Sequence, residues 1–113
     1  MTVDLIKTRC HGDLHISQVM AASDDFFIID FEGEPSRPIA ERRRKNCPLR
    51  DIAGILRSSD YAAAAALRER ATIRPELSGP LRPWSDDWRQ RVKEAFLVAR
   101  HEAIGDCRSF PRE

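Results

Sequence analysis

Two stretches of sequence decide the fold: HGDLHISQ at residues 11–18 and IIDFE at residues 28–32. Around them, the apolar runs Ile16–Ala22 and Phe26–Phe31 flank a polar tripeptide at residues 23–25. β-Branched and aromatic residues on both sides of a polar turn are typical of a β-hairpin. The sequence therefore predicts a loop, a short hairpin, and a second loop that begins where the hairpin ends.

Because a hairpin places its two ends close together, polar side chains from both ends are expected to meet. Asp13 and Gln18 come before the predicted hairpin, whereas Asp30 and Glu32 follow it. Three carboxylates and one amide would then converge, and no Lys or Arg occurs between residues 10 and 36. Oxygen ligands of this kind suit Mg²⁺, which typically binds one or two carboxylates together with substrate phosphates.

The spacing of these residues is also the spacing used by phosphotransferases, where H-R-D-x-x-x-x-N precedes a hairpin and a metal-binding Asp follows it. This chain reads H-x-D-x-x-x-x-Q from His11 to Gln18, and Asp30 begins a DFE tripeptide where protein kinases have Asp-Phe-Gly. Asp13 would accept or orient the proton of an attacking hydroxyl, while Gln18 and Asp30 would hold the metal. His11 would orient the catalytic loop. Phosphoryl transfer needs this arrangement because it depends on positioning and charge neutralisation.

Length and composition limit the alternatives. The chain has 113 residues, 33% of them charged and 42% hydrophobic, which fits a single domain and excludes a disordered tail or a membrane span. The 19 basic and 18 acidic side chains give a formal net charge of +1, but residues 10–36 are acidic and residues 37–50 are basic. With this total charge, and no aromatic residue in the basic run, we expect no nucleic-acid partner.

The three cysteines are Cys10, Cys47 and Cys107, which form no C-x-x-C pair and predict free thiols in a reducing cytoplasm. The N-terminal sequence has no long apolar segment, so we expect neither a signal peptide nor a membrane anchor.

Beyond the hairpin, the sequence predicts two main helices. Residues 1–48 are expected to contain the catalytic loop, the hairpin and a basic loop. Apolar residues at helical spacing from Leu49 onward, followed by an alanine run, predict a helix over residues 49–70. Three prolines and Gly79 predict a Pro-rich loop over residues 71–84. Ser85 is expected to cap a second helix over residues 85–104.

The residues quoted above also carry a family resemblance. HGDLHISQV, FFIIDFEGEPSRPIAERRRK and CPLRDIAGILRSSDYAAAA resemble the maltokinases, including those fused to trehalose synthase. These belong to the aminoglycoside-phosphotransferase-like branch of the protein-kinase fold. The resemblance spans residues 8–66 and, more loosely, residues 88–100. It implies an α+β fold, a partial protein-kinase-like C-lobe, and ATP-dependent phosphorylation of maltose to maltose 1-phosphate.

By this resemblance Asp13 corresponds to the catalytic base, and Gln18 and Asp30 correspond to the ligands of Mg²⁺. Asp51 corresponds to the helix aspartate that braces the catalytic loop through its backbone. Ser59 departs from the family, whose members tend to have Phe there, and this change removes a packing group.

Several assignments remain open at this point. Glu32 and Glu34 either contact the metal or sugar hydroxyls, or pair with the following arginines. The run that contains Arg43 is either a solvated loop or a steering element for an anionic substrate, with Arg43 as a substrate-binding residue. Trp84 and Trp88 are either core anchors or platforms for a sugar.

The printed sequence contains no glycine-rich loop and no strand lysine for ATP, both of which a kinase requires. We therefore expect a single partial C-lobe, residues 1–113, inactive without a nucleotide lobe. The alternative is a non-catalytic interaction module, associated with a trehalose synthase or with itself through exposed apolar surface.

Overall fold

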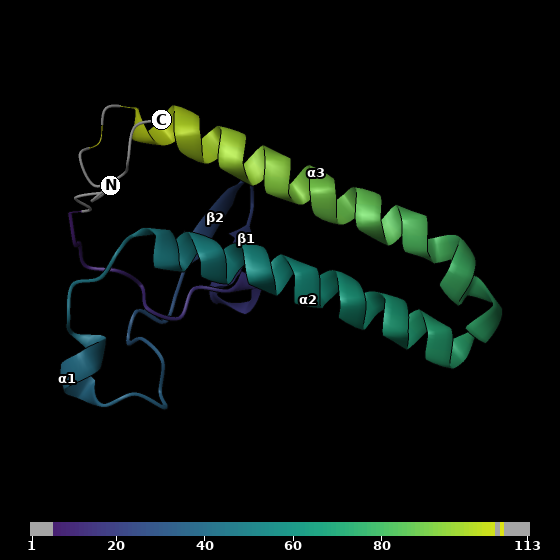
Figure 1. Ribbon diagram of the computed structural model, residues 1–113, viewed down its shortest axis with the longest axis horizontal. Coiled ribbons are helices and arrows are strands. Elements are labelled where there is room, and N and C mark those ends of the chain that lie inside the picture. Colours follow the sequence, from purple (N-terminus) through teal and green to yellow (C-terminus); the bar gives the residue numbers. More distant parts are fainter. Residues whose placement is uncertain (1–5, 106, 108–113) are drawn as a thin grey trace, which may run out of the picture. The chain divides into compact units, whose positions relative to one another are not determined.

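The computed structural model describes residues 6–105 and residue 107. These residues fall into two compact units, one containing residues 6–55 and 107 and the other containing Leu56–Gly105. Figure 1 shows the elements of both units. Among the described residues, no helix is long and apolar enough to cross a membrane.

The first unit contains the predicted hairpin. Strand β1 (Val19–Ala22) pairs antiparallel with β2 (Asp25–Ile28), and Ala22 faces Asp25 across the two-residue turn. Ser23 has a φ of 54°, which supplies the positive φ that such tight turns need. A one-turn 3-10 helix, η1 (Ile16–Gln18), precedes β1. The predicted hairpin is therefore confirmed, and the hairpin together with the helices confirms the α+β fold class.

A backbone bridge within this unit joins the segment before the predicted catalytic loop to the segment before α2. The backbones of Thr8 and Asn46 form an isolated antiparallel bridge, with N···O distances of 2.9 and 2.8 Å. The sequence predicts a basic loop between the hairpin and residue 48, but this segment is not entirely loop. It contains a one-turn helix, α1 (Ile39–Arg42), because the Pro38 carbonyl accepts the N–H groups of Glu41 and Arg42.

Helix α2 (Leu49–Ile73) begins at the predicted residue and ends three residues beyond the predicted end. Its first part belongs to the first unit and its remainder to the second. Ser59 is 2% exposed and its hydroxyl donates to the Leu56 carbonyl at 2.7 Å. The residue that departs from the family pattern is thus fully buried and satisfied by its own helix.

The predicted Pro-rich loop over residues 71–84 is wrong. A 3-10 turn, η2 (Pro75–Leu77), joins α2 to helix α3 (Ser78–Ile104), so α3 begins seven residues before the predicted cap at Ser85. Pro80 lies in the first turn of α3, where a helix has no use for its N–H groups. Pro83 lies inside the helix, where it cannot donate to the Gly79 carbonyl and its ring crowds that carbonyl.

Candidate functional site

The predicted catalytic loop is held by a carboxylate from the first turn of α2. Asp51 accepts the backbone N–H of His11 at 2.6 Å through Oδ2 and that of Gly12 at 2.9 Å through Oδ1. Hydrogen bonds that involve a charged partner are among the stronger ones in proteins. Two neighbouring N–H groups of the loop are therefore fixed by one side chain.

His11 is the second fixed point of the loop. Its side chain is buried, with only 7% of the residue exposed. Nδ1 accepts the backbone N–H of Asp13 at 3.3 Å, so Nε2 carries the proton and donates to the Ile29 carbonyl at 2.7 Å. The ring also packs against Phe31, with centroids 4.9 Å apart. His11 thus links the loop before the hairpin to the residues that follow it.

Two glycines allow these segments to come this close. Gly12 has a φ of 90° and Gly33 a φ of 81°, a region that favours glycine. A Cβ at Gly12 would lie 3.3 Å from the Cα of Gly33, and one at Gly33 would press on the side chain of Arg42. The backbones before and after the hairpin therefore meet where neither residue has a side chain.

A third glycine brings α2 against the loop. A Cβ at Gly54 would lie 2.6 Å from the carbonyl oxygen of Leu14, closer than real side chains approach. Gly54 was not predicted as a site residue. The only signal in the sequence is a glycine inside a helical pattern, where it usually has a packing or functional reason.

Gln18 and Asp30 meet across the base of the hairpin. The amide Nε2 of Gln18 donates to Oδ2 of Asp30 at 2.9 Å, and the Gln18 carbonyl accepts the backbone N–H of Ile29 at 2.9 Å. Asp30 has a φ of 61°, a conformation that a residue with a side chain adopts infrequently and that is often found at functional sites.

One carboxylate and one amide fit Mg²⁺, which is commonly held by one or two carboxylates together with phosphate oxygens. In the present geometry the amide of Gln18 presents its nitrogen to Asp30. Ligation by both residues would need that amide to rotate, so that its oxygen faces the same side as the carboxylate.

The predicted convergence of three carboxylates is not found. Across residues 6–105 and 107, no group of three or more His, Cys, Asp or Glu side chains is arranged to hold a metal ion. Asp13 lies beside His15, with its Oδ2 3.8 Å from Nε2. Glu32 is exposed, and its backbone carbonyl accepts from Arg42 at 3.4 Å. The hairpin is short, so it aligns the backbones at its base without bringing every acidic side chain to one point.

The basic segment pairs with Glu34. This carboxylate accepts from Arg37 at 2.8 Å and from the Ser36 hydroxyl at 2.9 Å, and it lies 3.7 Å from Arg50. The hydrogen bond from Arg37 is the main cause that lowers the pKa of Glu34. Arg43 is exposed, and within the described part of the chain it makes no ion pair. Pairing with the arginines thus applies to Glu34, whereas substrate binding by Arg43 stays a prediction.

Cys10 directly precedes His11, and its Sγ lies 3.5 Å from the carbonyl oxygens of Thr8 and Asn46. Burial, and secondarily the charge of Asp51, raise the pKa of its thiol. A raised pKa disfavours the reactive thiolate, which fits a packing role for this side chain. Cys47 and Cys107 are also free thiols, as predicted.

Comparison with known proteins places this geometry in context. No family model matches the chain. A glucosamine kinase of Streptacidiphilus jiangxiensis is 27% identical over 74 residues, which cover 66% of this chain and 16% of that protein. A glucosamine kinase of Mycolicibacterium smegmatis (strain ATCC 700084 / mc(2)155) is 41% identical over 59 residues, which cover 51% of this chain and 14% of that protein.

Solved structures extend the likeness to most of the chain. The structure of a glucosamine kinase in complex with glucosamine, ADP and inorganic phosphate matches with a TM-score of 0.72 at 22% identity, over 88% of this chain and 23% of that one. A second glucosamine kinase structure, crystal form A, matches with a TM-score of 0.70 at 23% identity, over 89% of this chain and 23% of that one.

The fold is thus one found within solved glucosamine kinases, and part of the sequence is related to glucosamine kinases. The matched part of the chain spans 14–16% of the length of these curated relatives. These relatives are glucosamine kinases, and the maltokinase resemblance stays a prediction.

Proposed function

We propose that this chain forms the phosphate-transfer centre of a sugar kinase. The observation that carries the proposal is the contact of Gln18 with Asp30 at 2.9 Å, beside a loop whose backbone is held by His11 and Asp51. The spacing of these residues matches the order in which phosphotransferases use a base and two metal ligands. The partial relationship to glucosamine kinases supports the same reaction class.

Asp13 is the catalytic base in this proposal. Its backbone N–H is fixed by His11, and its carboxylate remains partly exposed to an incoming hydroxyl. The carboxylate accepts, or orients, the proton of the sugar hydroxyl while that oxygen attacks the terminal phosphate. General-base catalysis by a positioned side chain contributes about 10²–10⁴-fold to a rate.

Gln18 and Asp30 are the ligands for Mg²⁺. Held by these two side chains, the ion would supply charge neutralisation for the phosphates. The left-handed backbone at Asp30 and the hydrogen bond from Ile29 to the Gln18 carbonyl keep the two side chains at the same end of the hairpin.

The acceptor is a sugar, and two sugars are candidates. The sequence resemblance favours maltose, phosphorylated at its anomeric hydroxyl. The names of the relatives favour glucosamine, which is also bound in one of the matching structures. Glu32 and Arg43 are exposed and follow Asp30 in the sequence, and we propose them as contacts for the acceptor sugar.

ATP is the proposed phosphate donor. The 113 residues contain no glycine-rich loop and no lysine in a V-A-I-K-like setting, so we propose that a separate nucleotide lobe holds the ATP phosphates. The free thiols fit a reducing compartment, and we propose the cytoplasm.

The decisive experiment combines the chain with a separately produced nucleotide lobe of the M. smegmatis glucosamine kinase and Mg-ATP. Phosphorylation of glucosamine and of maltose is followed by ADP release. We expect activity that Asp13→Asn lowers by about 10²-fold or more. Asp87→Asn makes the same chemical change on α3 and should leave the rate unchanged. Equal rates for Asp13→Asn and the unchanged chain would overturn the assignment.

Metal binding tests the same centre without the second lobe. Binding of Mn²⁺, as a probe for Mg²⁺, is measured on the isolated chain by paramagnetic line broadening. The broadening should centre on Gln18 and Asp30, and Asp30→Asn should weaken it while Asp87→Asn does not. Broadening that is indifferent to Asp30→Asn would remove the metal assignment.

A second candidate function is a non-catalytic interaction module. The observation in its favour is that the acidic side chains around the hairpin do not gather into a three-carboxylate group within the described residues. Such a module would bind no Mn²⁺ at Asp30, yet would form a defined complex with a partner such as a trehalose synthase.

A further inference from the structure

The second unit has an apolar hollow between α2 and α3. Its α2 side carries small residues, including Ala62 and Ala66, and its α3 side carries Trp84 and Trp88. The hollow measures about 440 Å³, within the size range of sites that receive a side chain or ligand. We call it the Trp hollow.

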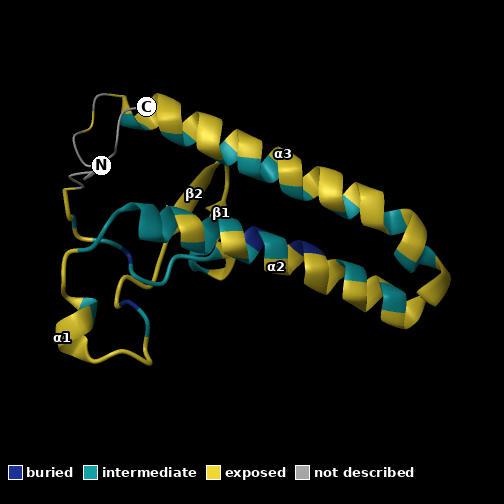
Figure 2. Ribbon diagram, viewed as in Figure 1, coloured by how far each residue is buried: buried dark blue, intermediate teal, exposed yellow. Residues whose placement is uncertain are grey.

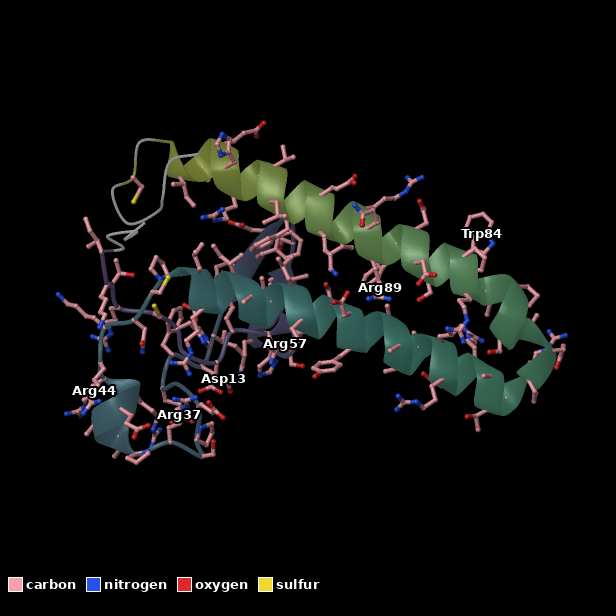
Figure 3. The ribbon with its side chains drawn as sticks, viewed as in Figure 1. Asp13, Arg37, Arg44, Arg57, Trp84 and Arg89 are labelled. Atoms are coloured by element: carbon pink, nitrogen blue, oxygen red, sulfur yellow. The ribbon has the colours of Figure 1, made fainter. Side chains whose placement is uncertain are left out.

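Both tryptophans of the Trp hollow are open to solvent. Trp84 is 74% exposed and Trp88 is 44% exposed, and Figure 3 shows the side chain of Trp84 projecting from α3. Buried tryptophans act as core anchors. Two exposed tryptophans beside alanine side chains instead form an apolar surface patch of the kind that binds another apolar group.

A sugar fits the apolar lining of the Trp hollow poorly. Sugars need several hydrogen-bond partners, and the lining offers only the Arg70 guanidinium and the Ser85 hydroxyl as polar side-chain groups. An apolar side chain fits this lining better than a sugar. An acidic group beside it could pair with Arg70, which makes no ion pair with any described residue.

The β1–β2 hairpin has the complementary properties. Met20 and Phe27 are cross-strand partners, 52% and 54% exposed, and Figure 2 shows both strands largely exposed. Asp24 lies in the hairpin turn, and its carboxylate has no hydrogen bond or ion pair among the described residues. The hairpin tip, defined as residues 20–27, is therefore apolar and acidic, whereas the hollow is apolar with a basic rim.

We propose that the Trp hollow of one copy of this chain receives the hairpin tip of a second copy. Met20 and Phe27 pack against the two tryptophans, and Asp24 lies beside Arg70. The occupant is a second copy because the chain itself supplies both the exposed apolar surfaces and the opposite unpaired charges.

The size of the contact sets its strength. The exposed parts of these aromatic side chains, with Met20, offer roughly 400 Å² per contact. Stable interfaces bury about 1,200 Å² or more, so one such contact is weak and association depends on concentration. Each contact leaves one hairpin and one hollow free to bind further copies.

A charge exchange tests the proposal by sedimentation equilibrium over a dilution series at low salt. We expect Arg70→Glu and Asp24→Arg each to weaken self-association about tenfold or more, since each opposes like charges. The double variant Asp24→Arg/Arg70→Glu should restore it, which also shows that both changes are compatible with folding. Added salt should weaken the wild-type association.

Arg68→Glu is the matched control. Arg68 is two residues from Arg70 on α2, is exposed, and does not line the hollow, so the net charge changes equally while the contact stays. Three outcomes overturn the proposal: a monomer up to about 1 mM, equal effects of Arg70→Glu and Arg68→Glu, or no rescue in the double variant. Since only association is measured, none of these outcomes bears on phosphate transfer.

Discussion

In the first unit, single polar groups hold backbone segments from different parts of the chain. Asp51 holds two loop N–H groups, and His11 reaches the Ile29 carbonyl across the base of the hairpin. In the second unit, Leu56–Gly105, the helices are joined by surface ion pairs such as Asp60 with Arg89 at 3.0 Å. Exposed ion pairs are worth little, whereas unsatisfied backbone groups are costly. The first unit should therefore respond sharply to single polar changes, and the second should tolerate them.

Both tryptophans of the chain lie in the second unit, which allows the two units to be followed separately. Tryptophan fluorescence reports on Trp84 and Trp88, whereas amide hydrogen exchange at His11 and Gly12 reports on the loop.

The largest expected effect comes from Asp51→Ala. The change leaves the N–H groups of His11 and Gly12 without their acceptor, at a cost of about 3 kcal/mol in the free energy of unfolding of the first unit. Amide exchange at both residues should accelerate by about 100-fold, while tryptophan fluorescence stays unchanged. Asp87→Ala, which removes only an exposed pair with Arg91, should cost less than about 0.5 kcal/mol. Equal effects of the two variants would contradict the contrast between the units.

The next effect concerns glycines in helices and differs in size between the units. Gly54→Ala places a Cβ 2.6 Å from the Leu14 carbonyl, so the loop must move and the first unit should lose about 2 kcal/mol. Gly79→Ala meets nothing within 4 Å in α3 apart from its chain neighbours, and its gain in helix propensity is opposed by the following Pro80, so the second unit should change by less than about 1 kcal/mol. Thermal unfolding by circular dichroism measures both. A stabilising Gly54→Ala would show that α2 does not press on the loop.

The same contrast explains how much of the structure the sequence could predict. The hairpin was predictable because its signals are local: apolar runs, a polar turn and their spacing. The prolines predict a break before Ser85, yet α3 begins at Ser78. Pro80 lies in the first turn, where the helix does not use the missing N–H, and α3 continues through Pro83.

The site divides in a similar way. The contact of Gln18 with Asp30 follows from the hairpin register, which local patterns can supply. The approach of Gly54 to the Leu14 carbonyl depends on how a helix crosses a loop forty residues earlier in the chain, and no periodicity encodes that crossing. The failure of the acidic residues to converge has a different origin. Side-chain directions at a short hairpin depend on local backbone conformations such as the positive φ of Asp30, which the residue pattern does not specify.

The smallest expected effect is the acid response of the second unit. Hydrogen bonds from Arg89, and then from Lys93, lower the pKa of Asp60 below its ordinary value of 3.8. A carboxyl with a lowered pKa contributes its full stabilisation above its unfolded pKa and loses it as the pH falls through the folded value. Stability followed by tryptophan fluorescence should thus be flat above about pH 5 and decline below about pH 4. Asp60→Asn should flatten the decline, whereas Asp87→Asn should alter it less, since Asp87 pairs with Arg91 within one helix. An unchanged acid profile in Asp60→Asn would show that this pair contributes nothing to holding α2 and α3 together within the second unit.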